Sequence, residues 1–136
     1  MKNVLRLLIL SLLTAFVLSS CDEFPKFEGT YTGTLTISSQ IYDYPVESSA
    51  TVVIERDFKD ITADYTSGLG TFTLSGKIDN EGNFSISVTG YTTENEAYLI
   101  TDAGTINYND GSYSSVITIV VEGESAVTGT LVLTKS

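Results

Sequence analysis

Apolar side chains alternate with threonine, serine or charged residues from Gly29 onward, and this alternation limits the fold more than any other feature. In the segment 29–38, every second residue is threonine or serine, and tyrosine, leucine and isoleucine occur between them. The segments 70–78, 82–91 and 125–135 repeat this pattern. A period of two belongs to a strand with one buried face, whereas a helix repeats about every 3.6 residues. The chain is therefore predicted to be an all-β domain of half-buried antiparallel strands.

Turn-forming residues divide this region into eight predicted strands. Their approximate bounds are 29–38, 47–56, 58–66, 70–78, 82–91, 97–108, 112–122 and 125–135. Short links such as 79–82 and 109–111 carry the asparagine, aspartate and glycine of tight hairpins, so consecutive strands should be neighbours. A meander of eight strands leaves two exposed edges unless the sheet closes. We expect an eight-stranded antiparallel up-and-down barrel, with a β-sandwich as the alternative.

The predicted inner face contains both large aliphatic residues and glycines. The residues expected to form one core, each from a different strand, are Leu35, Ile54, Leu74, Ile86, Ile117 and Leu131. The glycines assigned to the same face are Gly33, Gly76, Gly90, Gly104 and Gly129. Glycine inside a strand marks a sharp bend or a close approach by another group. Here it indicates either strongly coiled strands that close a small barrel or space for a ligand.

The first twenty residues have the organisation of a secretory signal. Lys2 and Arg6 precede an apolar run, Leu7–Leu18, which is too short to span a bilayer, and small residues follow it. The sequence Leu18-Ser19-Ser20-Cys21 resembles the lipobox of bacterial lipoproteins, in which the cysteine receives a lipid before the leader is removed. An ordinary signal peptide with an incidental cysteine is the alternative. The expected divisions are a signal peptide at 1–20, a lipid-anchored tether at 21–28 and the barrel at 29–136.

Two acids follow the cysteine directly. Asp22 and Glu23 resemble the export signal of surface lipoproteins in the Bacteroidota, and the alternative is that they begin a solvated tether. The resemblance implies an outer-membrane lipoprotein that is exposed at the cell surface and held in the membrane by lipid on Cys21.

Charge and residue usage exclude several functions. After removal of residues 1–20, five basic residues remain against all seventeen acids, a net charge of 5 − 17 = −12. Such a chain repels phosphate backbones, which argues against nucleic acid as a partner. The chain has no histidine and a single cysteine, so the usual general base, thiolate nucleophile and transition-metal ligands are missing. We therefore expect no enzymatic activity, no cofactor and no metal. For the acidic cluster Asp57, Asp60 and Asp64, surface ion pairing is favoured over calcium binding.

One acid and several tyrosines are candidate ligand-binding residues. Asp102 follows the alternation of a predicted strand and should point inward, unless a bulge turns it to solvent. A buried carboxyl group needs a polar partner. Tyr98 and Tyr108 are assigned inward on the same strand, and Tyr42 and Tyr44 lie in the loop after the first strand. Tyrosine rings beside a barrel mouth could cap an apolar ligand or stack on a sugar, and core packing is the alternative.

Both ends of the domain resemble a known family. The opening run Phe27-Glu28-Gly29-Thr30-Tyr31-Thr32-Gly33-Thr34-Leu35 and the closing run Val127-Thr128-Gly129-Thr130-Leu131-Val132-Leu133-Thr134 are similar to the calycin-like, lipocalin-like barrel domains of Bacteroidota lipoproteins. The resemblance covers residues 28–135 and implies a barrel that often holds a small apolar molecule. The chain has no tryptophan, so the opening tryptophan of true lipocalins is absent and no functional residue carries over. Two functions remain open: a binding module for a small apolar or glycan ligand, and a structural or interaction protein that acts through its surface.

Overall fold

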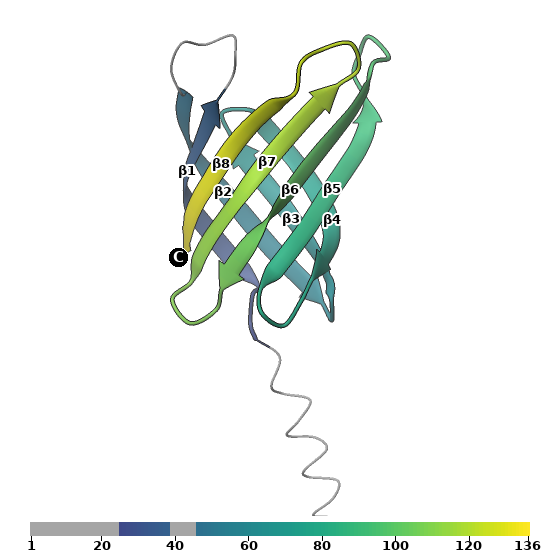
Figure 1. Cartoon of the computed structure of the whole chain (residues 1–136). Coiled ribbons are helices and arrows are strands. Elements are labelled where there is room, and N and C mark those ends of the chain that lie inside the picture. The colour runs from purple at the N-terminus through teal and green to yellow at the C-terminus, as the bar shows by residue number, and fades with distance from the viewer. Residues whose placement is uncertain (1–24, 39–45) are drawn as a thin grey trace, which may run out of the picture.

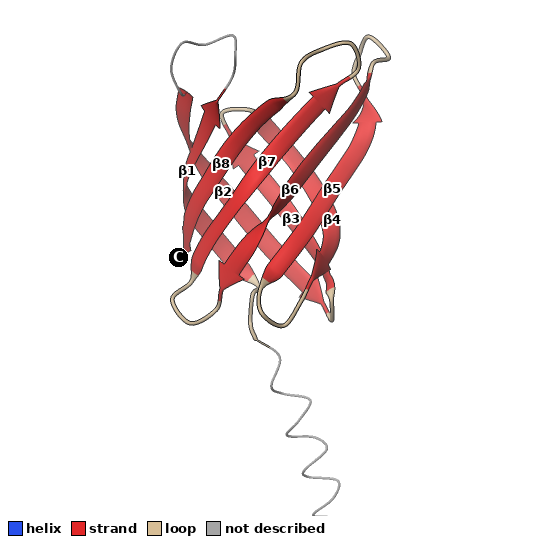
Figure 2. Cartoon of the chain, in the orientation of Figure 1, coloured by secondary structure: helices blue, strands red, loops and turns tan. Residues whose placement is uncertain are grey.

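The computed structural model describes residues 25–38 and 46–136, which form eight β-strands (Figure 2). The strands are β1 (Gly29–Ser38), β2 (Val46–Asp57), β3 (Asp60–Ser67), β4 (Gly70–Ile78), β5 (Asn83–Tyr91), β6 (Ala97–Asn107), β7 (Ser112–Val121) and β8 (Val127–Lys135). These bounds agree with the predicted strands to within two residues. No helix within the described residues is long and apolar enough to cross a membrane.

The strands form one closed antiparallel barrel. Each strand pairs with the next along the chain, and β1 pairs with β8, where Leu35 lies opposite Leu131 (Figure 1). The predicted eight-stranded up-and-down barrel is confirmed, and the sandwich alternative is wrong. Closure follows from the short links, since a meander of strands with one apolar face buries that face and removes both edges by curling onto itself.

The barrel has two distinct ends. At the tether end, residues 25–28 lead into β1, and the turns β2–β3, β4–β5 and β6–β7 lie beside them (Figure 1). At the far end are the turns β3–β4, β5–β6 and β7–β8. Two glycines at the tether end, Gly82 and Gly111, have φ angles of 90° and 73°, as the predicted hairpins required.

The core lies inside the barrel and matches the predicted register. The six residues predicted to form it are each at most 2 % exposed. Neighbours in sequence point outward, so Ile117 is 2 % exposed and Val116 is 54 % exposed. Truncating an aliphatic residue buried in this way costs about 2–5 kcal/mol, because transfer energy is lost and a cavity is left.

Four glycines assigned to the inner face lie where a neighbouring strand comes close, although Gly33 itself is exposed. At Gly33, Gly76 and Gly104, a Cβ would lie 2.0–2.1 Å from a carbonyl oxygen of the neighbouring strand. At Gly90, the space is occupied by the ring of Tyr98, whose hydroxyl would be 2.5 Å from a Cβ. At these four positions, protein atoms occupy the place of a side chain, which supports the close-packing explanation there.

One seam in the barrel wall is weakly paired. β4 and β5 form only four residue pairs, from Ser75↔Ser87 to Ile78↔Phe84. The other neighbouring strands form eight to ten pairs each. Within the described part of the chain, the far-end segments 70–74 of β4 and 88–91 of β5 are therefore not paired with each other. The wall is weakest at this place.

Candidate functional site

A buried polar cluster lies inside the barrel. Asp102 of β6 is fully buried, so the inward prediction is confirmed and the bulge alternative is wrong. Its Oδ2 accepts hydrogen bonds from the hydroxyl groups of Tyr65 on β3 and Tyr113 on β7, the latter at 2.6 Å. The two hydroxyl oxygens lie 2.9 Å apart. Three strands thus converge on one carboxyl oxygen.

Both tyrosines of the cluster stay protonated. Burial raises the pKa of the Tyr65 hydroxyl, and the neighbouring Tyr113 and Asp102 raise it further. Burial also raises the pKa of Tyr113 well above its ordinary value, with Asp102 adding to the rise. The hydroxyl groups therefore remain hydrogen-bond donors at neutral pH, which the carboxyl oxygen requires.

Two oxygen atoms of this region lack a hydrogen-bond partner among the described residues. They are the second carboxyl oxygen of Asp102, Oδ1, and the hydroxyl of Ser115, which is 4 % exposed. Ser115 lies on β7 directly opposite Gly104. Gly104 follows Asp102 by two residues on β6, so Asp102 and Ser115 are on the same inner face. Buried polar atoms are nearly always hydrogen-bonded, so two unsatisfied atoms on adjacent strands mark the cluster as more than a packing feature.

Among the described residues, the apolar side chains at the far end of the interior are only half-buried. Five half-buried side chains pack against the core: Ile37, Phe72, Val88, Tyr98 and Ile119. The Phe72 ring stacks on the Tyr65 ring, with centroids 5.0 Å apart. The polar cluster is therefore linked by direct ring contact to the apolar residues of the far end.

The tether end, in contrast, is closed by the chain itself. Phe27 is fully buried, and its carbonyl accepts a hydrogen bond of 2.7 Å from the Tyr31 hydroxyl. The Arg56 guanidinium lies over the Phe27 ring, 5.3 Å from its centroid, and its Nη1 donates to the Pro25 carbonyl at 2.5 Å. The last residues of the predicted tether are thus an integral part of the barrel.

The structure separates the predicted ligand-binding residues. Tyr98 lies at the far end and Asp102 in the buried cluster, whereas the prediction that Tyr108 points inward is wrong. β6 ends at Asn107, so Tyr108 lies in the turn at the tether end, 53 % exposed, with its ring edge-to-face against Phe27. The alternation of inward and outward side chains ends with the strand, one residue before Tyr108. The remaining predicted residues, namely Tyr42, Tyr44, Cys21, Asp22 and Glu23, lie outside the described residues.

Sequence reasoning missed Tyr65, Tyr113 and Ser115 as members of the cluster. Tyr65 follows Ile61 and Ala63 at a spacing of two, so its inward direction could have been assigned from the pattern. Its partner could not, because Asp102 lies 37 residues further along the chain.

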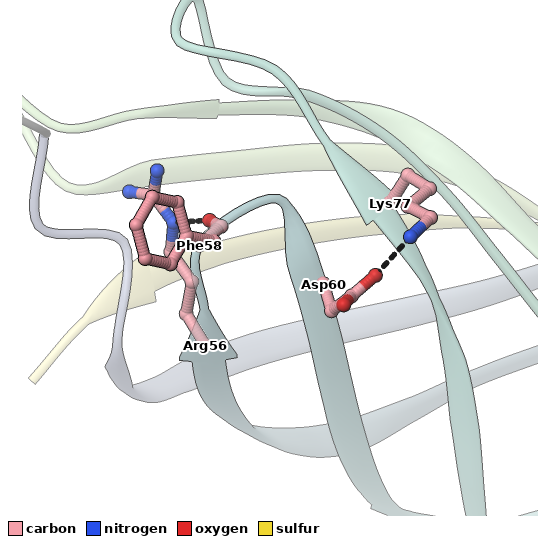
Figure 3. Close-up of polar contacts among 4 residues, drawn as sticks. All are labelled: Arg56, Phe58, Asp60 and Lys77. Atoms are coloured by element: carbon pink, nitrogen blue, oxygen red, sulfur yellow. Dashed lines mark hydrogen bonds and ion pairs between the residues drawn. The ribbon is translucent and has the colours of Figure 1, made fainter.

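Two of the three residues of the acidic cluster on the outer surface have polar partners. Asp60 forms an ion pair with Lys77 (Figure 3), and Asp64 accepts a hydrogen bond of 2.6 Å from Thr73. Nearby, the Arg56 Nε donates to the Phe58 carbonyl (Figure 3). Within residues 25–38 and 46–136, no group of three or more histidine, cysteine or acidic side chains is arranged to hold a metal ion.

An open hollow of about 720 Å³ lies beside the β4–β5 hairpin at the tether end. Lys59, Lys77, Asp79 and Glu81 contribute to its lining, so charges of both signs meet there. Asp79 already serves the hairpin, because its Oδ1 accepts backbone hydrogen bonds of 2.9 Å from Glu81 and Asn83. Both bonds lower the pKa of the Asp79 carboxyl, and the bond from Asn83 has the larger effect. Asp79 is therefore engaged within the hairpin, and we take the interior cluster as the candidate site. No family model, curated protein or solved structure matches this chain.

Proposed function

We propose that the mature protein is a non-catalytic, lipid-anchored lipoprotein of the outer membrane whose calycin-like barrel binds a small, largely apolar ligand. The observation that carries the proposal is the difference between the two ends. Phe27 fills the tether end, whereas half-buried apolar side chains line the far end. A ligand would enter from the far end, where its apolar part would replace water on these side chains.

The short tether supports a fixed orientation. If Cys21 carries the lipid, only residues 22–24 lie between it and Pro25, whose carbonyl is bonded to Arg56. Four steps of extended chain span at most about 14 Å. The tether end would therefore stay close to the membrane, and the far end would face away from it.

Charge distribution favours the same orientation. All five basic residues that follow Cys21 lie at or beside the tether end: Lys26, Arg56, Lys59, Lys77 and Lys135. Within the described residues, the far end carries no basic side chain and several acids: Glu47, Glu94, Glu96, Glu122 and Glu124. Anionic headgroups repel such an end, which keeps it away from the bilayer.

Two measurements test the proposal. Cys21→Ser should abolish incorporation of labelled fatty acid and release the protein from membranes, since stable anchoring requires acyl chains. Native mass spectrometry of the soluble chain 22–136 should show a co-purified small molecule. Continued labelling of the Cys21→Ser protein would contradict lipid attachment at Cys21. A barrel that never carries or takes up a small molecule would contradict the proposed ligand binding.

A second function, as an interaction protein, has one observation in its favour. Leu99 and Val120 are paired on the outer face of β6 and β7, and Tyr91 projects from the end of β5; they are 39 %, 40 % and 75 % exposed. An exposed apolar group is a place where a partner protein could dock. If this is the function, Val120→Lys should prevent recruitment of the partner without changing small-molecule binding.

A further inference from the structure

We infer that Asp102 and Ser115 recognise a hydrogen-bond-donating head group, an amine or a hydroxyl, on the small apolar ligand. The inference rests on the proposed ligand-binding function and specifies the chemistry of the ligand. It starts from the two unsatisfied oxygens, Asp102 Oδ1 and Ser115 Oγ, both in the barrel interior.

The acceptor character of the site follows from the arrangement of its donors. Both tyrosine hydroxyls are directed to Asp102 Oδ2, and Oδ1 is left without a donor among the described residues. A carboxylate oxygen accepts hydrogen bonds and does not donate them. Ser115 Oγ can accept as well as donate. The group that completes the site must therefore bring N–H or O–H donors, which a ligand carboxylate lacks.

Asp102 and Ser115 are neighbours on the inner face of the barrel. Asp102 lies opposite Ile117, and Ser115 lies opposite Gly104, so Asp102 and Ser115 are diagonal neighbours on the inner face. Diagonal neighbours in an antiparallel sheet have Cα atoms roughly 7–8 Å apart. Gly104 keeps the two strands close, because a Cβ there would lie 2.6 Å from the Ser115 Cβ. The two side chains therefore project from adjacent strands into the same part of the interior.

The weak seam provides a way to the cluster. Tyr65 lies directly opposite Phe72 on β4, and Asp102 lies directly opposite Ile86 on β5. Ile86 is paired with Gly76, whereas Phe72 lies beyond the paired residues, so the cluster lies where the paired part of the seam meets its unpaired far-end part. Movement of the half-buried Phe72 would let an alkyl chain extend from the polar cluster toward the apolar far end.

The experiment compares three probes with the same six-carbon chain: hexylamine, 1-hexanol and hexanoate. Each is titrated into the mature chain 21–136 carrying Cys21→Ser, and binding is followed by the amide resonances of Asp102 and Ser115. We expect hexylamine and hexanol to bind at least roughly tenfold more tightly than hexanoate, the factor that one hydrogen bond is worth.

Asp102→Asn sharpens the test. Its oxygen can still accept from the tyrosines, while its amide places N–H donors where Oδ1 was. The preference should therefore invert, with hexanoate gaining and hexylamine losing affinity. The matched control is Asp64→Asn, a carboxyl group on the outer face of the barrel, which should leave all three affinities unchanged. Ser115→Ala should weaken donor probes only.

Several outcomes would overturn the inference. They are equal affinities for the three probes, equal effects of Asp102→Asn and Asp64→Asn, and a crystal structure of the hexylamine-soaked protein with only a water at Asp102 Oδ1. A co-purified apolar molecule found together with any of these would leave the proposed binding function intact and remove only its donor specificity.

Discussion

Tyr65 and Asp102 are hydrogen-bonded to each other across the interior of the barrel, and they lie on the strands that flank the β4–β5 seam. Tyr65 belongs to β3 and Asp102 to β6. Their bond therefore connects the two strands on either side of β4 and β5, whose backbone ladder is the shortest in the barrel. A buried side-chain bond in the interior thus compensates for missing pairing in the wall. It also fixes the orientation of the carboxyl group and directs its second oxygen away from the tyrosines.

Loss of this bond should destabilise the barrel. Tyr65→Phe removes one of the two donors to Asp102 Oδ2, and a hydrogen bond contributes about 0.5–1.5 kcal/mol to stability. We expect the free energy of unfolding to fall by that amount in urea titrations. Tyr98→Phe is the control, because Tyr98 is half-buried and removal of its hydroxyl should change stability by about 0.5 kcal/mol or less. Equal losses in the two variants would contradict the role of the bond.

The inward and outward registers can be separated on a single strand. Ile117 is buried and Val116, its neighbour, is more than half exposed, although both are aliphatic. Ile117→Ala should lower the free energy of unfolding by about 2–5 kcal/mol, and Val116→Ala by about 0.5 kcal/mol or less. The comparison isolates side-chain direction from hydrophobicity. A larger loss from Val116→Ala would show that the register is shifted by one residue.

Removal of the Phe27 ring should show that the tether end is part of the folded domain. Phe27 is fully buried and contacts Tyr108 and the Arg56 guanidinium. Phe27→Ala should cost about 3–5 kcal/mol, the usual range for a buried aromatic side chain. Tyr91→Ala, at an exposed ring, provides the comparison. If Phe27→Ala melts like the unaltered protein, the barrel is independent of its tether.

Alkaline pH should destabilise the protein through its buried tyrosines. Burial, with a smaller contribution from Glu28, raises the pKa of Tyr31 to about 12, above the value near 10 of an unfolded chain. A raised pKa means that the folded state holds the proton more tightly. The associated stability is therefore complete below pH 10 and is lost as the pH rises toward 12.

Tyrosine ionisation in the ultraviolet spectrum measures this effect directly. Of the eight tyrosines, Tyr31, Tyr65 and Tyr113 should ionise late and together with unfolding. Ionisation of all eight near pH 10 in a protein that stays folded would contradict their burial.

The strand pattern was predictable because it is local. Threonine alternating with aliphatic residues specifies both the strand and its buried face, so Leu35 and Leu131 could be placed in the core from the sequence alone. The short hairpins specified the order of the strands. Closure followed, because a curled meander of eight such strands has no other way to cover its edges.

The candidate site was only partly predictable, because it depends on contacts across the barrel. The inward direction of Asp102 follows from its strand, but its partner Tyr65 is 37 residues away and on a strand that is not adjacent. Tyr108 is separated from Asp102 by an even number of residues, as an inward-facing residue of the same strand would be. It still lies outside the interior, because β6 ends one residue earlier, at Asn107. The short β4–β5 ladder likewise has no signature in the sequence, since both strands alternate normally along their whole length.

Closure between the first and last strands is the premise of the interior site, and a disulfide across that junction tests it most directly. Thr34 and Val132 lie opposite each other on β1 and β8 and face outward. Directly opposed residues have Cα atoms about 4.5–5.5 Å apart, within the range that a disulfide spans. In the Cys21→Ser chain, Thr34→Cys with Val132→Cys should oxidise to an intramolecular disulfide and raise the stability of the protein. Two free thiols that remain after mild oxidation of the folded protein would contradict the closed barrel.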